Sequence, residues 1–203
     1  GWSTSKALFG SPPSDGSAAR AALLTRAHGG DATDPSRSAS RTVPGAVTGN
    51  PTATPSPTTM RVAKHGPGSF QVVPGRQAAP DNGPKAKRMT VRVEVEKGTD
   101  VDLQAFAAQV MQTLNDPRSW GHGGTLTFAR TDAKTADIRV ILASPDTSER
   151  MCKPLETHGV QSCSIGNKAV LTSYRWAKGT KEFPSLTIYR EYVVNHEVGH
   201  VLG

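Results

Sequence analysis

Two histidines and a glutamate near the C-terminus are the residues whose types and spacing point most directly to chemistry. They stand in the run His196-Glu197-Val198-Gly199-His200. Histidines four residues apart on a helix project from one face, where two neutral imidazoles can bind one Zn²⁺. Glu197 lies one step around the helix, where its carboxylate can take a proton from a metal-bound water that attacks a carbonyl. We therefore predict that His196 and His200 are zinc ligands and that Glu197 is the catalytic base.

A glycine three residues beyond the second histidine narrows the type of metal site. In the pattern HExxHxxGxxH the helix breaks at the glycine, which can adopt a positive φ, and a third histidine reaches the metal. Gly203 occupies that position, although a glycine also ends many ordinary helices. Spacing does not nominate His28, His65, His122 or His158 as the third ligand. We expect that ligand beyond Gly203, and so expect this chain alone to bind zinc weakly and to hydrolyse nothing.

The segment that must position these residues, Leu186 to Leu202, is the strongest helix pattern in the chain. Its apolar residues cover much of the helix circumference, which predicts substantial burial. A second helix is expected from Asp100 or Asp102 to about Leu114, and a short helical turn that starts at Ser144-Pro145 and contains Thr147 to Cys152. Strand patterns lie at residues 70–73, 90–96, 125–129, 138–142 and 168–172. The order β-α-β-β-β-α predicts an α/β (α+β) fold, a mixed sheet with the last helix packed on it.

Two of the strand patterns suggest positions in the sheet. Residues 138–142 are more continuously apolar than the other strand patterns, which is typical of a central strand. Chain order places residues 168–172 next to the last helix, and we predict that this strand lies at the sheet edge. A peptide could bind there by strand addition.

The first third of the chain differs from the rest in composition. Residues 1–66 are rich in Ser, Thr, Pro, Ala and Gly and contain only one short apolar run. Such a segment cannot bury enough apolar surface to offset the entropy of ordering it. We predict a disordered arm over residues 1–66, with a flexible linker or an O-glycosylated stalk near residues 51–59, followed by one domain over residues 67–203.

The charge of the chain argues against a nucleic-acid partner. The formal net charge is +7, and the one tight basic cluster is Lys85-Ala86-Lys87-Arg88 in an expected loop. Nucleic-acid binding would favour a basic face interleaved with aromatic residues, and no such pattern is present. We expect a solvated basic surface able to contact an anionic envelope.

The two cysteines, Cys152 and Cys163, give information about the cellular compartment in which the protein folds. They do not form a CxxC pair, so they do not indicate a zinc site; either they form a disulfide or both are free. Together with the Ser/Thr/Pro-rich arm they favour an oxidising environment. The sequence begins with Gly1 and includes no signal peptide and no apolar run long enough for a membrane span, and we expect native segments beyond both of its ends.

Several short sequence segments of the domain resemble those of an uncharacterised family of secreted or envelope-anchored actinobacterial proteins. That family is classed with the zincins by its HExxHxxG motif. The segments and residues that carry the resemblance are Ala143-Ser144-Pro145, Met151-Cys152, Cys163, Trp176, residues 116–120 and residues 189–203. The resemblance covers about residues 68–203. It implies a zincin-like fold, a signal or membrane anchor upstream, a Cys152–Cys163 bridge and a third histidine just beyond Gly203.

Two functions fit this sequence best. The first is a monomeric zinc-dependent metallopeptidase of the cell envelope or exterior, which hydrolyses a peptide or protein substrate with a zinc-activated water. The alternative is a zincin-fold binding module of the envelope that has no turnover. The presence of Glu197 favours the enzyme, because a binding module has no need of a carboxylate at that position.

Overall fold

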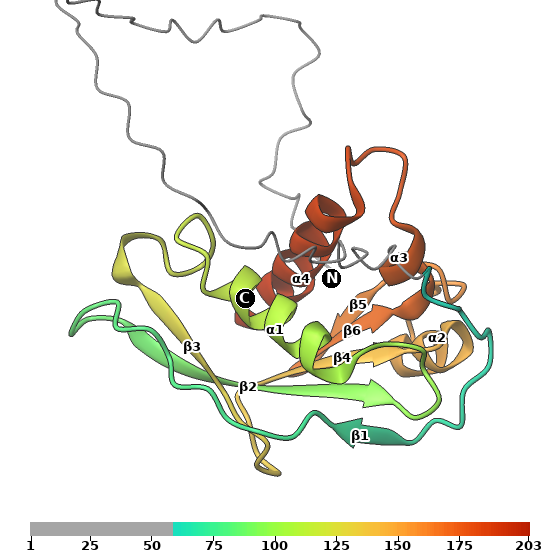
Figure 1. Cartoon of the computed structure of the whole chain (residues 1–203), viewed down its shortest axis with the longest axis horizontal. Helices are drawn as coiled ribbons and strands as arrows, with labels where there is room; N and C mark the ends of the chain where they lie inside the picture. Colours follow the sequence, from blue (N-terminus) through green and yellow to red (C-terminus); the bar gives the residue numbers. More distant parts are fainter. Residues whose placement is uncertain (1–58) are drawn as a thin grey trace, which may run out of the picture. The chain divides into compact units, whose positions relative to one another are not determined.

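A computed structural model describes residues 59–203, so residues 1–58 of the arm predicted over residues 1–66 lie outside the described part (Figure 1). The described chain has six strands, four α-helices and one 3₁₀ turn, His122–Gly124. The strands are β1 (Phe70–Val72), β2 (Lys87–Glu96), β3 (Leu126–Arg130), β4 (Ile138–Ala143), β5 (Cys163–Ile165) and β6 (Lys168–Thr172). The helices are α1 (Leu103–Leu114), α2 (Pro145–Cys152), α3 (Ser173–Lys178) and α4 (Leu186–Leu202). No helix within residues 59–203 combines the length and the apolar character that crossing a membrane requires.

The strands form one mixed sheet, which confirms the predicted fold class. Its order is β1-β2-β4-β6-β5, and β3 also pairs with β2. The β2 pairings with β3 and β4 and the β4 pairing with β6 are parallel, whereas β1 and β5 are antiparallel to their neighbours. β4 lies between β2 and β6 and is almost wholly buried, so the prediction of a central strand at residues 138–142 is confirmed.

The prediction that residues 168–172 form the sheet edge is wrong. β6 pairs with β4 on one side and with β5 on the other. β5 and β6 form a hairpin in which Ile165 pairs with Lys168 across the two-residue turn Gly166-Asn167, and Gly166 has a φ of 58°. A strand of three residues is too short to show alternation, and a Gly-Asn turn was the signal that could have revealed it. The edge strand beside α4 is therefore β5.

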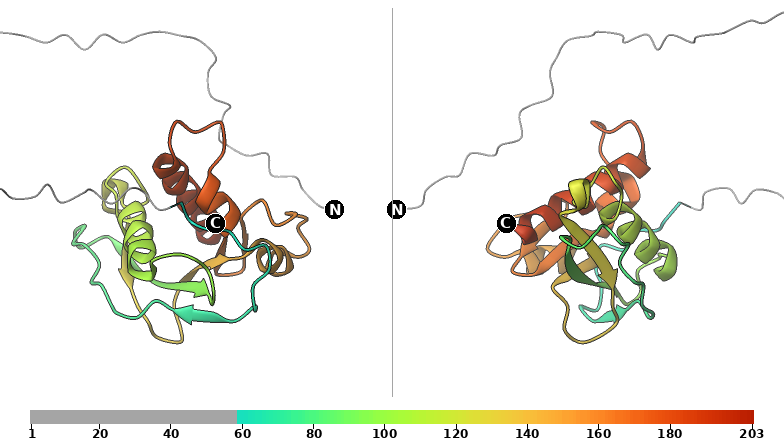
Figure 2. Two further views of the ribbon diagram at one scale, coloured as in Figure 1. Left: turned by 45° about the vertical axis from the view of Figure 1, so that its right-hand side comes forward. Right: turned by 90° about the vertical axis from the view of Figure 1, so that its left-hand side faces the viewer.

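α1 and α4 pack on one face of the sheet, as Figures 1 and 2 show. The alternating valines of β2, Val91, Val93 and Val95, are fully buried beneath them together with Leu142 and Leu171. Asp102 starts α1, because its side chain accepts a hydrogen bond from the Ala105 amide at 2.7 Å. Ser185 caps α4 in the same way, through the Ile188 amide at 3.2 Å.

The opposite face of the sheet contains a buried ion pair as well as apolar residues. Glu94, which is only 2% exposed, accepts a bidentate hydrogen bond from Arg139 on the neighbouring strand. At the other end of this face, Val170 packs with Ala143 and the two cysteines. The larger apolar core of the described chain therefore lies on the face under α1 and α4.

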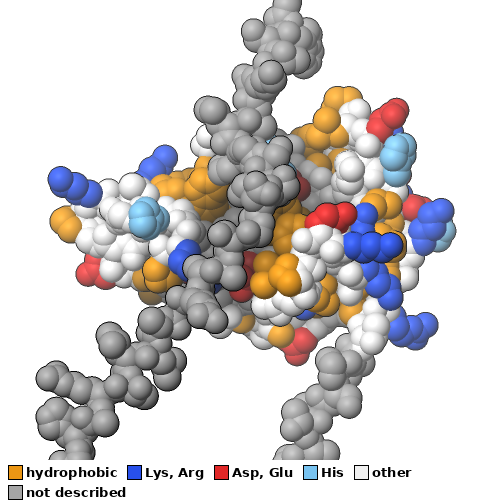
Figure 3. Space-filling view, turned by 90° about the horizontal axis from the view of Figure 1, so that it is seen from above, with side chains coloured by type: hydrophobic (Ala, Val, Ile, Leu, Met, Phe, Trp, Pro, Cys, Tyr) orange, Lys and Arg blue, Asp and Glu red, His pale blue; other side chains and the backbone are white. Residues whose placement is uncertain are grey.

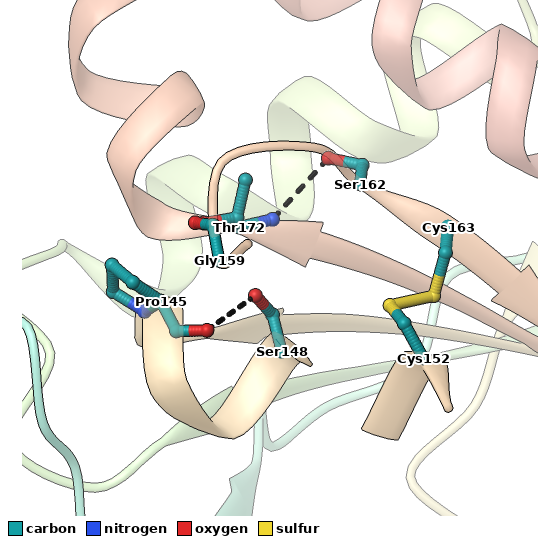
Figure 4. The surroundings of a disulfide bond; sticks show 7 residues. All are labelled: Pro145, Ser148, Cys152, Gly159, Ser162, Cys163 and Thr172. Carbon is teal, nitrogen blue, oxygen red and sulfur yellow. Dashed lines mark hydrogen bonds between the residues drawn. A yellow bond between two sulfur atoms is a disulfide. The ribbon is translucent and has the colours of Figure 1, made fainter. Parts of the chain in front are cut away.

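The cysteines form the bridge that the family resemblance implied. Cys152 at the end of α2 is bonded to Cys163 at the start of β5, with their Cα atoms 5.9 Å apart (Figure 4). Both residues are buried. The bridge fixes α2 to the edge strand, and it is compatible with an extracellular location.

Contacts with the domain begin earlier than the predicted boundary at residue 67. We call residues 59–68 the leading segment. The backbone amide of Arg61 donates to the Asp100 carboxylate at 2.9 Å, and the carbonyl of Lys64 accepts from the Asp146 amide at 3.1 Å. Met60 packs against the main core. The part of the arm prediction that covers residues 59–66 is therefore corrected: these residues belong to the domain.

Candidate metal centre

His196 and His200 lie on the exposed side of α4 and point toward one another. Their Nε2 atoms are 3.2 Å apart, and their rings meet edge to face at an interplanar angle of 89°. Two nitrogens bound to one tetrahedral zinc at ordinary Zn–N distances lie about 3.3 Å apart. The structure thus brings the two predicted ligands to the separation that a shared metal requires.

Among the described residues, only these two side chains come together as candidate metal ligands. Within residues 59–203 no third His, Cys, Asp or Glu joins the pair in a group that could hold a metal. His65 instead pairs with Asp146. In the absence of metal, an Nε2–H···Nε2 hydrogen bond would give the same distance between the two rings. The donor chemistry of the pair fits zinc.

Burial sets the properties of Glu197. Its side chain faces inward from α4, where the residue is only 5% exposed, and no hydrogen bond to its carboxylate is present in the described chain. This burial raises the pKa of Glu197 to about 7, because desolvation disfavours the charged form. A carboxylate with such a pKa is a better proton acceptor near neutral pH than an exposed glutamate.

Tyr192 is a neighbour of the histidine pair that the sequence analysis did not single out. It stands one turn before His196, with the two ring centroids 5.2 Å apart and its hydroxyl 3.4 Å from Nδ1 of His196. A hydroxyl oxygen that accepts from Nδ1–H leaves Nε2 free for a metal. The spacing of four residues on a helix was a signal that could have identified it.

Burial, and secondarily the neighbouring His200, lower the pKa of His196. Both effects favour the neutral imidazole, because each penalises the positive charge of the protonated ring. The neutral form is the one that coordinates a metal.

The loop before β3 supports α4 from the side. Ser119 donates a hydrogen bond to the Asn195 side chain at 2.8 Å. The Trp120 ring lies against the α4 backbone at Gly199, where an added Cβ would be 2.8 Å from Cζ2 of the ring. Gly199 lies between the two histidines, so its lack of a side chain lets the tryptophan pack directly behind the motif.

Gly203, the glycine of the motif, directly follows α4. The helix stops at Leu202, and Gly203 has a φ of 108°, which favours glycine. The amide of Gly203 still donates to the Gly199 carbonyl at 3.2 Å.

The fold and the site define a mixed α/β domain that carries a convergent, exposed histidine pair on its last helix. The family described as "Protein of unknown function (DUF3152)" matches residues 56–203, and the chain belongs to this family. No curated protein and no solved structure matches the chain significantly. The family assignment agrees with the resemblance to an uncharacterised family, and any activity must be argued from the site itself.

Proposed function

We propose that this domain belongs to a zinc-dependent metallopeptidase. The observation that carries the proposal is the 3.2 Å separation of the His196 and His200 Nε2 atoms, side by side on one exposed helix face. Two further features support it. Glu197 is adjacent in sequence and has a raised pKa, and Tyr192 is placed to orient the first imidazole.

Each residue has a separate role in this proposal. When bound, zinc supplies a Lewis acid that polarises the substrate carbonyl and lowers the pKa of a bound water. His196 and His200 hold the metal through Nε2, and Tyr192 keeps the His196 ring in the tautomer that can do so. Glu197 accepts the proton of the attacking water and passes it to the leaving amine of the peptide.

A zinc site with two protein ligands is incomplete for catalysis, since catalytic zinc sites have three. We propose that the third ligand comes from outside the described residues, and that it is a histidine, as in the HExxHxxGxxH pattern. The substrate is a peptide or protein, and the protein acts as a monomer in the cell envelope or outside the cell. The buried Cys152–Cys163 bridge supports that location.

Replacement of Glu197 by glutamine tests the proposal in the natural protein. Glutamine keeps the size of the side chain but cannot accept the proton, so zinc content should stay the same. Cleavage of a peptide library should fall roughly a hundredfold or more. Glu191→Gln on the same helix is the matched control and should leave both quantities unchanged. Equal cleavage by Glu197→Gln and the unchanged protein would contradict the proposal.

The same experiment decides about the alternative function. Full zinc loading of the unchanged protein with no cleavage of any peptide would leave the metal site in place. It would favour a zinc-bearing envelope module that binds without turnover.

A further inference from the structure

A second site of a different kind lies apart from the histidine pair. A groove of about 750 Å³ runs between the leading segment, the start of α2, the loop at residues 157–160 and α3. Its described lining includes no residue of α4, so it is separate from the candidate metal centre. The volume is in the range that holds a small-molecule ligand.

The inner wall of this groove is held by hydrogen bonds. Thr172 at the end of β6 donates its hydroxyl to the Gly159 carbonyl at 2.8 Å. Gly159 has a φ of 66° and lies so close to Pro145 that an added Cβ would be 2.7 Å from the Pro145 carbonyl oxygen. The outer wall is fixed by the bond between the Asp146 amide and the Lys64 carbonyl. These contacts fix the positions of both walls of the groove within the folded domain.

The groove combines an apolar interior with a basic rim. Its apolar lining residues come from the leading segment, α2, the 157–160 loop and α3: Met60, Val62, Pro145, Val160 and Tyr174. Arg61, Lys64 and Lys178 also line it, together with His158, and none of the described lining residues is Asp or Glu. Figure 3 shows Lys and Arg side chains gathered over the end of the molecule that carries α2 and α3.

The two acidic residues Asp100 and Asp146, which contact the leading segment, already have partners. The Asp100 carboxylate accepts the Arg61 backbone amide at 2.9 Å. The Asp146 carboxylate pairs with His65, whose side chain is 76% exposed. No ion pair is formed by the side chain of Arg61, Lys64 or Lys178 with a described residue. Three cations are thus free to meet an anion at the rim of an apolar groove.

We propose that this groove binds a phosphate-headed amphiphile, with the apolar chain along the groove and the head group against Arg61, Lys64 and Lys178. Burial of the chain provides the affinity, and a charge-assisted contact to the phosphate fixes its direction. An inorganic anion would leave the apolar interior of the groove unfilled. An uncharged alkyl chain would leave the basic side chains at the rim without an anionic partner. The same head-group chemistry occurs in a free lipid and at a membrane surface.

Dodecyl phosphate, kept below its micelle concentration, is the probe for the free ligand. Its binding to the full chain is measured by calorimetry beside inorganic phosphate and dodecanol. One molecule should bind per chain, more tightly than either comparison compound. The triple variant Arg61→Gln/Lys64→Gln/Lys178→Gln should bind it roughly tenfold more weakly or worse. The matched control Lys85→Gln/Lys87→Gln/Arg88→Gln removes three charges at and just before the start of β2, where none lines the groove, and should bind normally.

Vesicles with and without a phosphate-headed anionic lipid distinguish the membrane source. Binding to the anionic vesicles that the groove variant loses and the control retains would assign the ligand to a membrane. Binding of dodecyl phosphate alone would assign it to a free lipid. Equal weakening in both triple variants would overturn the proposal, because it would show a general charge effect. Dodecyl phosphate binding no tighter than inorganic phosphate would also overturn it.

Discussion

Glu96, the last residue of β2, is a fully buried carboxylate that joins three parts of the chain. Its oxygens accept hydrogen bonds from the Gly68 amide at 2.7 Å, the Ser144 amide at 2.6 Å and the Thr147 hydroxyl at 2.7 Å. Burial alone would raise its pKa, but these hydrogen bonds outweigh burial and hold the pKa below its ordinary value of 4.5. The charged form of Glu96 therefore stabilises the fold.

A lowered pKa in the folded state gives a defined pH dependence. The stabilisation is present above the unfolded pKa and is lost as the pH falls through the folded pKa, because the unfolded chain binds the proton more readily. We expect the free energy of unfolding to fall between pH 5 and pH 3. In Glu96→Gln it should be lower by about 2 kcal/mol at pH 7 and should depend less on pH. Urea unfolding at several pH values measures this, with the exposed Glu156→Gln as control. A pH dependence that Glu96→Gln leaves unchanged would contradict this role.

The packing of Trp120 against Gly199 leads to a testable prediction about the stability of α4. Alanine would ordinarily stabilise a helix interior by about 1 kcal/mol relative to glycine. Here the new Cβ would lie 2.8 Å from Trp120, so the ring must move. We expect Gly199→Ala to destabilise the domain by roughly 1–3 kcal/mol. In a Trp120→Ala background the same change should become neutral or stabilising. Destabilisation of equal size in both backgrounds would show that Trp120 is not the cause.

At the residue scale, the motif could be predicted from the sequence but its surroundings could not. Spacing alone placed His196 and His200 on one helix face, because a helix has one geometry. The contacts of Trp120 with Gly199 and of Ser119 with Asn195 join residues more than seventy positions apart. Such contacts depend on how α4 packs against the loop before β3, which no local pattern encodes.

At the element scale, the disulfide links α2 to the edge strand β5. On the chain-entropy model a bridge that closes so short a loop stabilises a fold by roughly 3 kcal/mol. The Cys152→Ala/Cys163→Ala variant should therefore unfold at a clearly lower urea concentration. A reducing agent should shift the unchanged protein in the same direction and leave the variant unaffected. Identical midpoints for the oxidised protein and the variant would contradict a stabilising role.

The strands illustrate what local patterns can and cannot predict about elements. The alternation of β2 and the mostly apolar run of β4 are local signals, and each correctly predicted a strand. The edge position of β5 was missed because it depends on a three-residue strand held by a turn and a bridge. α3 was also missed: six residues are too few to establish a helical period.

At the scale of the whole molecule, the leading segment makes the domain longer than its sequence pattern suggests. A protein that begins at residue 59 keeps Met60 against the core and the bonds to Asp100, Asp146 and Glu96. A protein that begins at residue 69 lacks all of them. We expect the second to be less stable than the first by about 2–4 kcal/mol, from lost burial and hydrogen bonds. Equal thermal stability of the two would show that residues 59–68 contribute nothing.

The central claim is that His196 and His200 share one zinc ion. The most direct test is the zinc content of the natural protein after dialysis, measured by elemental mass spectrometry for the unchanged protein, His200→Ala and His122→Ala. His122 is exposed in a 3₁₀ turn and serves as the matched control. We predict close to one zinc per chain in the unchanged protein and in His122→Ala, and a sharp loss in His200→Ala. Equal zinc content in the unchanged protein and His200→Ala would contradict the claim, and a hydrogen bond between the two rings would then explain their approach.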